Sequence, residues 1–412
     1  MPRSALSRRA LLAAVAATRP SFGAPFRALP FTIRREVPLQ DANPQFCWFH
    51  PRAVAIPKRG VRGVPRVVMT LSKHLDEDDH YSGLWYMYTD DLGATGKGPF
   101  EPKELVARRA ADGMHESVHD VTPGWHAKSG KVLAIGGRTY YAPSGKHVSG
   151  QIGKGGTAYT VYAPATDRWM GWKMLEFPAE PMFANCRSAC SQFVVKSDGS
   201  VLVPVYFQNL PTPYDGVTVL ECRFDGTTLR YARHGTVFSD KTKRGLAEPS
   251  IVAYGSKYYL TIRHDDYGYA TVSEDGLNYL PMKKWTFDDG SDLGSFNTQQ
   301  HWLAHSEGLF LSYTSRRPEN KHIARARAPL FIGQVDPERL CVVRSTEQVL
   351  IPERGLMLGN FGADAITAQE SWVTDAEFLW YRAGLKPTAK GGNGSVWVAR
   401  VQWSKPNRLA AE

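Results

Sequence analysis

Long helical patterns are missing from this sequence of 412 residues. The most helix-like stretch, residues 102–111, is short and basic, and no apolar run approaches the ~20 residues that a membrane-spanning helix needs. Walker-type phosphate loops and dinucleotide fingerprints are absent as well. These absences argue against an all-α protein, a helical membrane protein and a nucleotide-binding protein.

Cysteine is also scarce, and the five residues of this type are Cys47, Cys186, Cys190, Cys222 and Cys341. An odd number leaves at least one thiol without a disulfide partner. Cys186 and Cys190 lie close together in the sequence, but no second pair follows them, as a zinc ribbon requires. A local disulfide and two buried thiols both stay open as interpretations of this pair.

The net charge of +10 would suit a nucleic-acid-binding protein, but part of it comes from the N-terminus. A Ser-Arg-Arg segment at residues 7–9 precedes an apolar run at residues 10–17, which is typical of a twin-arginine export signal. We therefore predict that residues 1–24 are an export signal and that the protein is periplasmic or secreted. Without the four arginines before residue 23 the charge is +6, and we expect no nucleic-acid partner.

Apolar, aromatic and turn-forming residues are plentiful. Hydrophobic residues make up 42% of the chain and aromatic residues 11%, and there are 37 Gly and 27 Pro. This composition favours a buried core made of many short strands. Apolar strand patterns alternate with Asp-Gly turns, a strong signal for β-hairpins. These turns are Asp198-Gly199, Asp225-Gly226, Asp275-Gly276 and Asp289-Gly290.

A strand–turn–strand unit at residues 250–263 recurs at residues 301–313. Four-stranded units repeated at about fifty residues are typical of a β-propeller. We therefore predict an all-β protein with a single β-propeller domain over residues 25–412. The spacing favours seven blades, with six and eight as alternatives.

Polar residues inside apolar strands are the natural candidates for catalysis, because a propeller brings side chains from every blade to one axis. His50 ends an aromatic strand, Asp120 follows His119, and His301 opens an apolar strand after Gln300. We predict His50, His119 and His301 as catalytic residues, with a structural role for a buried histidine as the alternative.

Amides and arginines in similar positions suggest a substrate-binding surface. Amides bind vicinal hydroxyls, arginine binds a carboxylate through two hydrogen bonds, and aromatic rings stack on sugars. This inventory indicates a polyhydroxylated, acidic ligand. The predicted substrate-binding residues are Arg187, Gln192, Glu248, Arg263, Asn297, Gln300 and Asn360. No metal-ligand spacing is evident, so we expect no required cofactor.

Several motifs, in this order along the chain, resemble those of sialidase-like propellers that act on acidic polysaccharides of plants and algae. They are Cys-Trp-Phe-His-Pro-Arg (47–52), His-Asp-Val-Thr-Pro (119–123), Lys-Val-Leu-Ala-Ile-Gly (131–136), Glu-Pro-Ser (248–250), Asn-Thr-Gln-Gln-His-Trp (297–302), Arg-Ala-Pro-Leu-Phe (327–331) and Gly-Asn-Phe (359–361). The sequence resembles glycoside hydrolase family 145 and polysaccharide lyase family 25 over most of the chain after residue 40.

The resemblance implies cleavage of a rhamnose–uronic acid linkage in an acidic polysaccharide by β-elimination, with His119 and Arg187 in the lyase roles. A hydrolase that uses the single histidine His50 is one alternative, and a non-catalytic glycan-binding propeller is another. Some relatives carry a Ca²⁺ ion near the axis. The sequence departs from the family pattern at Gly137 and Phe193.

Sialidase activity is not expected from this sequence. Its one Asp-box-like segment, residues 89–95, is degraded, and no Phe-Arg-Ile-Pro element is present.

Overall fold

The central strands of this protein are buried on both faces. We describe the computed structural model for residues 26–75, 79–110, 112–148, 155–208, 214–381 and 384–410. In strand β2 (Cys47–Ile56), Val54 and Ile56 pack against one neighbouring sheet and Ala53 and Ala55 against the other. Because successive side chains point to opposite faces of a strand, such a strand lies between two layers.

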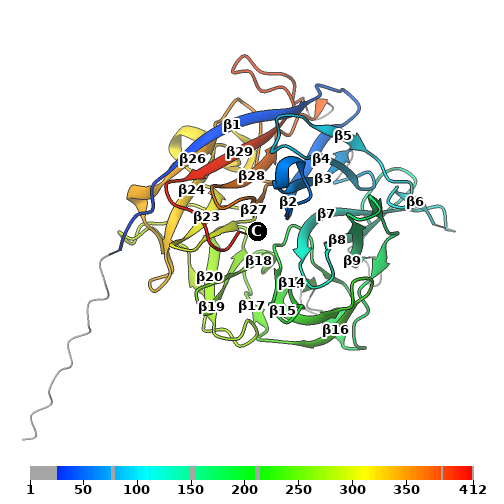
Figure 1. Cartoon of the computed structure of the whole chain (residues 1–412), viewed down its shortest axis with the longest axis horizontal. Helices are drawn as coiled ribbons and strands as arrows, with labels where there is room; N and C mark the ends of the chain where they lie inside the picture. Colours follow the sequence, from blue (N-terminus) through cyan, green and yellow to red (C-terminus); the bar gives the residue numbers. More distant parts are fainter. Residues whose placement is uncertain are drawn as a thin grey trace, which may run out of the picture.

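The described strands form six antiparallel sheets arranged around one axis (Figure 1). We call these sheets blades 1 to 6. Blade 1 holds β2, β3 (Arg66–His74), β4 (Trp85–Thr89) and β5 (Lys97–Phe100). Blade 2 holds β7 (His115–His126), β8 (Lys131–Tyr141), β9 (Gly155–Ala163) and β10 (Arg168–Trp169), with the short β6 (Arg108–Arg109) and β11 (Lys173–Met174). Blade 3 holds β12 (Cys186–Arg187), β13 (Val194–Val195), β14 (Ser200–Gln208), β15 (Asp215–Phe224), β16 (Leu229–His234) and β17 (Phe238–Ser239).

Blades 4 to 6 follow the same plan. Blade 4 holds β18 (Ala247–Tyr254), β19 (Lys257–Arg263), β20 (Gly268–Ser273) and β21 (Lys283–Lys284). Blade 5 holds β22 (His301–His305), β23 (Gly308–Thr314), β24 (Leu330–Asp336), β25 (Cys341–Val342) and β26 (Gln348–Ile351). Blade 6 holds β27 (Gly362–Ala365), β28 (Glu370–Ala376), β29 (Ser395–Trp403) and β1 (Phe31–Gln40). The helical turns are 3₁₀: η1 (Val61–Gly63), η2 (Pro181–Phe183), η3 (Pro318–Asn320), η4 (Ala324–Ala326) and η5 (Arg344–Thr346).

The predicted β-propeller is confirmed, but the prediction of seven blades is wrong, since the structure has six. The repeat length came from the first hairpins of blades 4 and 5, which begin near Ser250 and His301 and have tight turns. Blades 1 and 2 carry longer connections between their strands, such as the segment from β5 to β7. Dividing the chain by the short repeat therefore gave one blade too many.

Six apolar clusters fill the spaces between adjacent blades. The cluster between blades 1 and 2 contains Val54, Val132 and Tyr162, and the cluster between blades 3 and 4 contains Leu202 and Leu260. The other four clusters occupy the remaining interfaces in the same way. The hydrophobic core is therefore a ring of six interfaces around the axis.

The ring closes through strands from opposite ends of the sequence. β1 pairs with β29 in antiparallel register, with Phe31 opposite Trp403. Arg400 of β29 contacts Glu36 of β1 at 2.8 Å and Glu370 of β28 at 3.1 Å. Its guanidinium also lies 4.8 Å from the centre of the Trp372 ring. These contacts fasten the N-terminal strand as the outer edge of blade 6.

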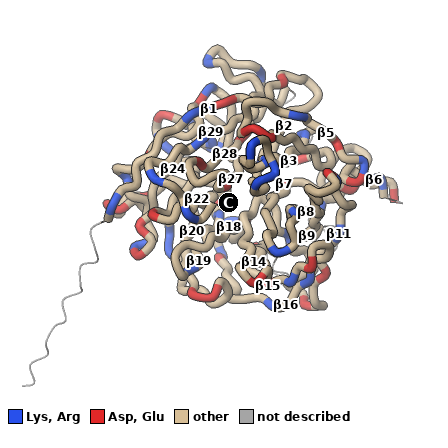
Figure 2. The backbone as a smooth tube through the Cα atoms, viewed as in Figure 1, with Lys and Arg blue, Asp and Glu red and all other residues tan. Residues whose placement is uncertain are grey.

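The charge is distributed around the ring. Figure 2 shows Lys and Arg positions interspersed with Asp and Glu positions on every blade. All five cysteines are buried, and Cys186 and Cys190 are not joined by a disulfide. No helix in the described ranges is long and apolar enough to cross a membrane. The predicted export signal, residues 1–24, lies outside the described residues.

We expect Arg400→Gln to lower the free energy of unfolding by about 3 kcal/mol, because it leaves the buried Glu370 carboxylate without its cation. The matched control is Arg34→Gln, since Arg34 pairs with Glu36 but its side chain is 64% exposed. An exposed pair of this kind contributes about 0.5 kcal/mol or less. Urea denaturation of both variants measures the difference, and equal losses would contradict this account of ring closure.

Candidate functional site

A left-handed residue lies within the innermost strand of each blade or a few residues before it. The φ angles are 52° at His50, 55° at Asp120, 57° at Cys190, 42° at Glu248, 46° at Asn297 and 99° at Gly359. At three of these places the strand pairing is interrupted by a register shift, between Phe49 and Arg52, between His119 and Thr122, and between Ala247 and Ser250. The left-handed residues gather polar side chains at one end of the axis, which we call the polar end.

Asp120 is the centre of one cluster at the polar end. Its Oδ1 atom lies 2.5 Å from His50 Nε2 and accepts a hydrogen bond of 2.7 Å from the Cys190 thiol. Its Oδ2 atom lies 2.8 Å from His119 Nδ1, and His119 Nε2 lies 2.8 Å from the Thr139 hydroxyl. The carboxylate thus joins side chains from blades 1, 2 and 3.

The electrostatics of this cluster favour an ionised Asp120. Burial by itself would raise the pKa of Asp120, but the interactions with His50 and His119 outweigh burial and hold the pKa well below its usual range. Burial lowers the pKa of His50, although Asp120 acts in the opposite direction. Burial also raises the pKa of the Cys190 thiol well above its usual value.

An aromatic wall positions the two histidines. The Tyr81 ring stacks on His119 with centroids 4.5 Å apart and lies 5.0 Å from His50. Phe49 contacts His50 edge-on at 4.5 Å. Tyr81 is 5% exposed, and no sequence pattern singled it out.

Arginines occupy the other half of the polar end. Arg263 donates hydrogen bonds to Glu248 and to the Asn297 side chain. Arg327 donates to the Asn297 carbonyl oxygen at 2.6 and 3.2 Å. Burial, together with the charges of Arg263 and Arg325, lowers the pKa of Arg327 to about 9. The structure therefore concentrates positive charge beside the Asp120 cluster.

Arg52 of β2 lies near the Asp120 cluster, and no sequence pattern singled it out. It is 1% exposed, and none of its three guanidinium nitrogens has a hydrogen-bond partner within the protein. Its nearest carboxylate oxygen is Asp120 Oδ1, at 3.8 Å from Nη2. A buried guanidinium without hydrogen bonds is energetically costly unless an anionic or polar group satisfies it.

Seven of the residues predicted from the sequence lie at or next to the polar end, namely His50, His119, Arg187, Glu248, Arg263, Asn297 and Asn360. Arg187 lies on β12 and donates to Asn185 at 3.3 Å. Asn360 follows the left-handed Gly359 and is 8% exposed. These side chains come from all six blades.

The other three predicted residues form hydrogen bonds with neighbouring groups of the protein. The amide of Gln192 crosses the axis, donates to the Trp302 and Ala363 carbonyls at 3.0 Å and accepts from the Trp302 N–H at 2.6 Å. Gln300 bonds to Thr261 and Thr298. His301 lies 3.1 Å from the Ser250 hydroxyl and is fully buried. All of these contacts are made within the protein, and Gln192 also lines the axial cavity described next.

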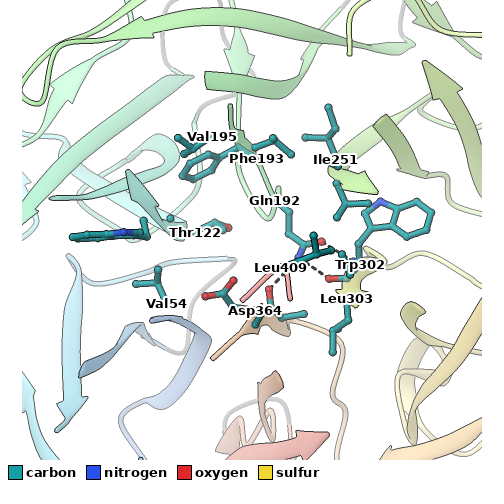
Figure 3. A pocket seen from close by; sticks show the side chains of 18 of the residues that line it. Val54, Thr122, Gln192, Phe193, Val195, Ile251, Trp302, Leu303, Asp364 and Leu409 are labelled. Carbon is teal, nitrogen blue, oxygen red and sulfur yellow. Dashed lines mark hydrogen bonds between the residues drawn. The ribbon is translucent and has the colours of Figure 1, made fainter. Parts of the chain in front are cut away.

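A separate axial cavity of about 460 Å³ lies beyond Gln192 (Figure 3). It is lined by Val54, Thr122, Phe193 and Asp364, among others, and Leu409 of the C-terminal segment borders it. None of the three predicted histidines lines this cavity. The cavity and the polar end are therefore two distinct environments on one axis.

Comparison with solved structures identifies the fold. A Dyadobacter fermentans protein of unknown function matches with a TM-score of 0.63 and 15% identity, over 90% of this chain and 99% of that one. The NanB sialidase of Streptococcus pneumoniae matches with a TM-score of 0.61 and 13% identity, over 88% and 70%. Trypanosoma rangeli sialidase matches with a TM-score of 0.56 and 14% identity, over 86% of this chain and 55% of that chain.

The chain therefore has a β-propeller fold of the sialidase-like type. No protein-family model matches it, and no curated protein matches its sequence. The predicted sialidase-like architecture is confirmed at the level of the fold.

Asp364 lines the axial cavity, and its raised pKa can be tested. Burial raises its pKa to about 7, although hydrogen bonds from the Ala55 and Ala365 N–H groups act in the opposite direction. Because this folded-state pKa exceeds the unfolded value of about 3.9, the group contributes stability at low pH that is lost as the pH rises through 7. We expect Asp364→Asn to be more stable than the wild type by about 1–2 kcal/mol at pH 8, a value reduced because the carboxyl partly faces the cavity.

The same variant should come within about 0.5 kcal/mol of the wild type near pH 4, where the carboxyl is protonated in the folded state and about half protonated in the unfolded state. Denaturant unfolding at both pH values measures this difference, and all other titrating groups cancel in the comparison. Stability profiles that stay parallel between pH 4 and 8 would contradict the raised pKa.

Proposed function

We propose that this protein cleaves an acidic glycan at a uronic acid, by β-elimination, at the polar end of the propeller. The observation that carries the proposal is the adjacency of a histidine–carboxylate cluster and a group of buried arginines around one axis. β-Elimination needs a cation to neutralise the uronate carboxylate and a base to remove the C5 proton. The two halves of the polar end supply these two groups.

His119 suits the role of the base. With the ionised Asp120 accepting a hydrogen bond from Nδ1, the proton of a neutral His119 lies on Nδ1. The lone pair then lies on Nε2, where the Thr139 hydroxyl can donate to it. A substrate C–H that takes the place of the Thr139 hydroxyl would meet an oriented, unprotonated nitrogen.

Arg263 and Arg327 suit the neutralisation of the carboxylate. Their guanidinium groups converge on Asn297, one through its side chain and the other through its carbonyl oxygen. Glu248 fixes Arg263 from the other side. A uronate that reaches this place would meet two oriented cations, and the carbanion formed at C5 would be stabilised by them.

The finer identity of the substrate rests on the motif resemblance. It supports a rhamnose–uronic acid linkage, as in ulvan or rhamnosyl-glucuronate oligosaccharides. Hydrolysis with His50 as the acid/base is the second candidate. The sialidases among the structural neighbours are glycosidases by name, and this supports glycan cleavage without distinguishing the two reactions.

Incubation of the purified protein with ulvan and rhamnosyl-glucuronate oligosaccharides tests the proposal. Elimination gives a new unsaturated uronate, detected by its ultraviolet absorbance, whereas hydrolysis gives free rhamnose without that absorbance. Reduction of the substrate carboxyl to an alcohol should abolish elimination and leave hydrolysis possible. The absence of both products across a panel of acidic glycans would overturn the proposal and favour a glycan-binding propeller.

We expect His119→Gln to lower kcat at least about 100-fold, as removal of a general base does, with a smaller change in KM. The matched control is His322→Gln, since the His322 side chain is 52% exposed and lies in no part of the polar end. Steady-state kinetics on the substrate that the wild type cleaves measure both. A kcat of His119→Gln equal to that of the control would exclude His119 as the base.

We also propose that residues 1–24 direct export, as the paired arginines and the apolar run suggest. Expression of the full chain in a bacterium, followed by N-terminal sequencing of the periplasmic product, should find a start near residue 25. Replacement of Arg8 and Arg9 by lysine should retain the uncleaved chain in the cytoplasm, and unchanged export would contradict the proposal.

A further inference from the structure

Three different donor atoms meet at one point of the polar end. His50 Nε2, Asp120 Oδ1 and Cys190 Sγ all lie within 4.8 Å of one another, and all three residues are buried. They come from β2, from β7 and from the segment between β12 and β13, so that three consecutive blades each contribute one. No other set of three such residues among the described ones meets the same condition.

The backbone explains why these side chains converge. Each of the three residues has the left-handed conformation, with φ between 52° and 57°. A non-glycine residue costs about 1–3 kcal/mol in such a conformation and keeps it only where the surroundings impose it. The Cys190 N–H donates to the Asp120 carbonyl at 3.2 Å, which joins two of the three backbones directly.

The same position in the other blades has a different chemistry. Glu248 and Asn297 are tied to Arg263, and Gly359 has no side chain. Only the three consecutive positions in blades 1 to 3 direct a nitrogen, an oxygen and a sulfur to a common point.

We propose that His50, Asp120 and Cys190 bind a zinc ion. An imidazole, a carboxylate and a thiolate together are the ligand types that Zn²⁺ combines in proteins, whereas Ca²⁺ and Mg²⁺ take oxygen ligands. Three protein ligands leave one position of a tetrahedron for water or substrate. This inference goes beyond the proposed function and does not depend on it.

The charges at the site suit a divalent cation with these ligands. Carboxylate and thiolate together balance Zn²⁺, so the bound centre is neutral beside Arg52. Arg52 is buried, has no hydrogen-bond partner and lies 3.8 Å from Asp120 Oδ1. Its guanidinium can therefore bind an anionic or polar group in the fourth position. On binding, the Cys190 thiol proton passes to solvent and the sulfur–metal bond forms.

The surroundings of Asp120 support a ligand role for its carboxylate. While Oδ1 faces His50 and Cys190, Oδ2 is held by His119, which Thr139 holds in turn. Protein carboxylates that bind metals are oriented by such hydrogen bonds. Ligand atoms with bonds of about 2.0–2.3 Å to one zinc lie roughly 3.5 Å apart, so binding requires His50 and Cys190 to move about 1 Å away from Asp120.

The experiment uses the purified full-length protein. Its metal content is first measured as isolated and again after dialysis against a chelator. Co²⁺ is then added, because Co²⁺ bound to a thiolate gives a sulfur-to-metal charge-transfer band in the near ultraviolet. We expect one Co²⁺ per chain, that band, and its displacement by Zn²⁺ but not by Ca²⁺.

Two cysteine variants make the assignment specific. Cys190→Ser should lose the charge-transfer band and bind Zn²⁺ at least about 10-fold more weakly. Cys186→Ser should keep both, because Cys186 is a buried thiol of the same blade that packs in the core between blades 2 and 3. His50→Gln should weaken binding while leaving the thiolate band visible at high Co²⁺.

Circular dichroism and thermal unfolding confirm that each variant is folded before its binding is compared. The proposal is overturned if the wild type gives no thiolate band at saturating Co²⁺. It is equally overturned if Cys190→Ser keeps the band or if Cys186→Ser is the variant that loses it. Glycan cleavage is not a readout in any arm, so a failure of the proposed function leaves this test intact.

Discussion

The central strands of the blades are buried on both faces, and this constraint governs the rest of the structure. A sheet of that kind is stable only between two neighbours, so the six blades must close into a ring in which every interface is filled. Ring closure brings the starts of six innermost strands to one axis. Side chains as distant in the sequence as His50 and Cys190 meet there as a result.

The polar end carries different side-chain types in blades 1 to 3 and in blades 4 and 5. Blades 1 to 3 supply His50, Asp120 and Cys190, and blades 4 and 5 supply Glu248 and Asn297 with the arginines that they hold. Arg52 of blade 1 lies near Asp120. The axial cavity is separated from them by the Gln192 amide.

The alternation of apolar residues and the Asp-Gly turns were sufficient to predict the propeller and strands such as β23 and β29. The number of blades was not predictable, because connections of unequal length obscure the repeat. At the site, the polarity of Gln192 and Gln300 did not show that their amides bind backbone groups of the protein. Cys190 was missed because its position at the site depends on its left-handed backbone. Arg52 was missed because only the structure shows that its guanidinium has no hydrogen-bond partner. Sequence patterns predict neither property.

The pairing of β1 with β29 has a consequence for how the chain is made. Phe31 leaves the ribosome long before its partner Trp403 is synthesised. Until β29 is synthesised, β1 is therefore an unpaired edge strand, and the face of blade 1 that packs against blade 6 stays exposed. Such a long sequence separation between partners makes closure a late and slow event of folding. We therefore expect the nascent chain to need a chaperone until the ring closes, and the folded protein to need none.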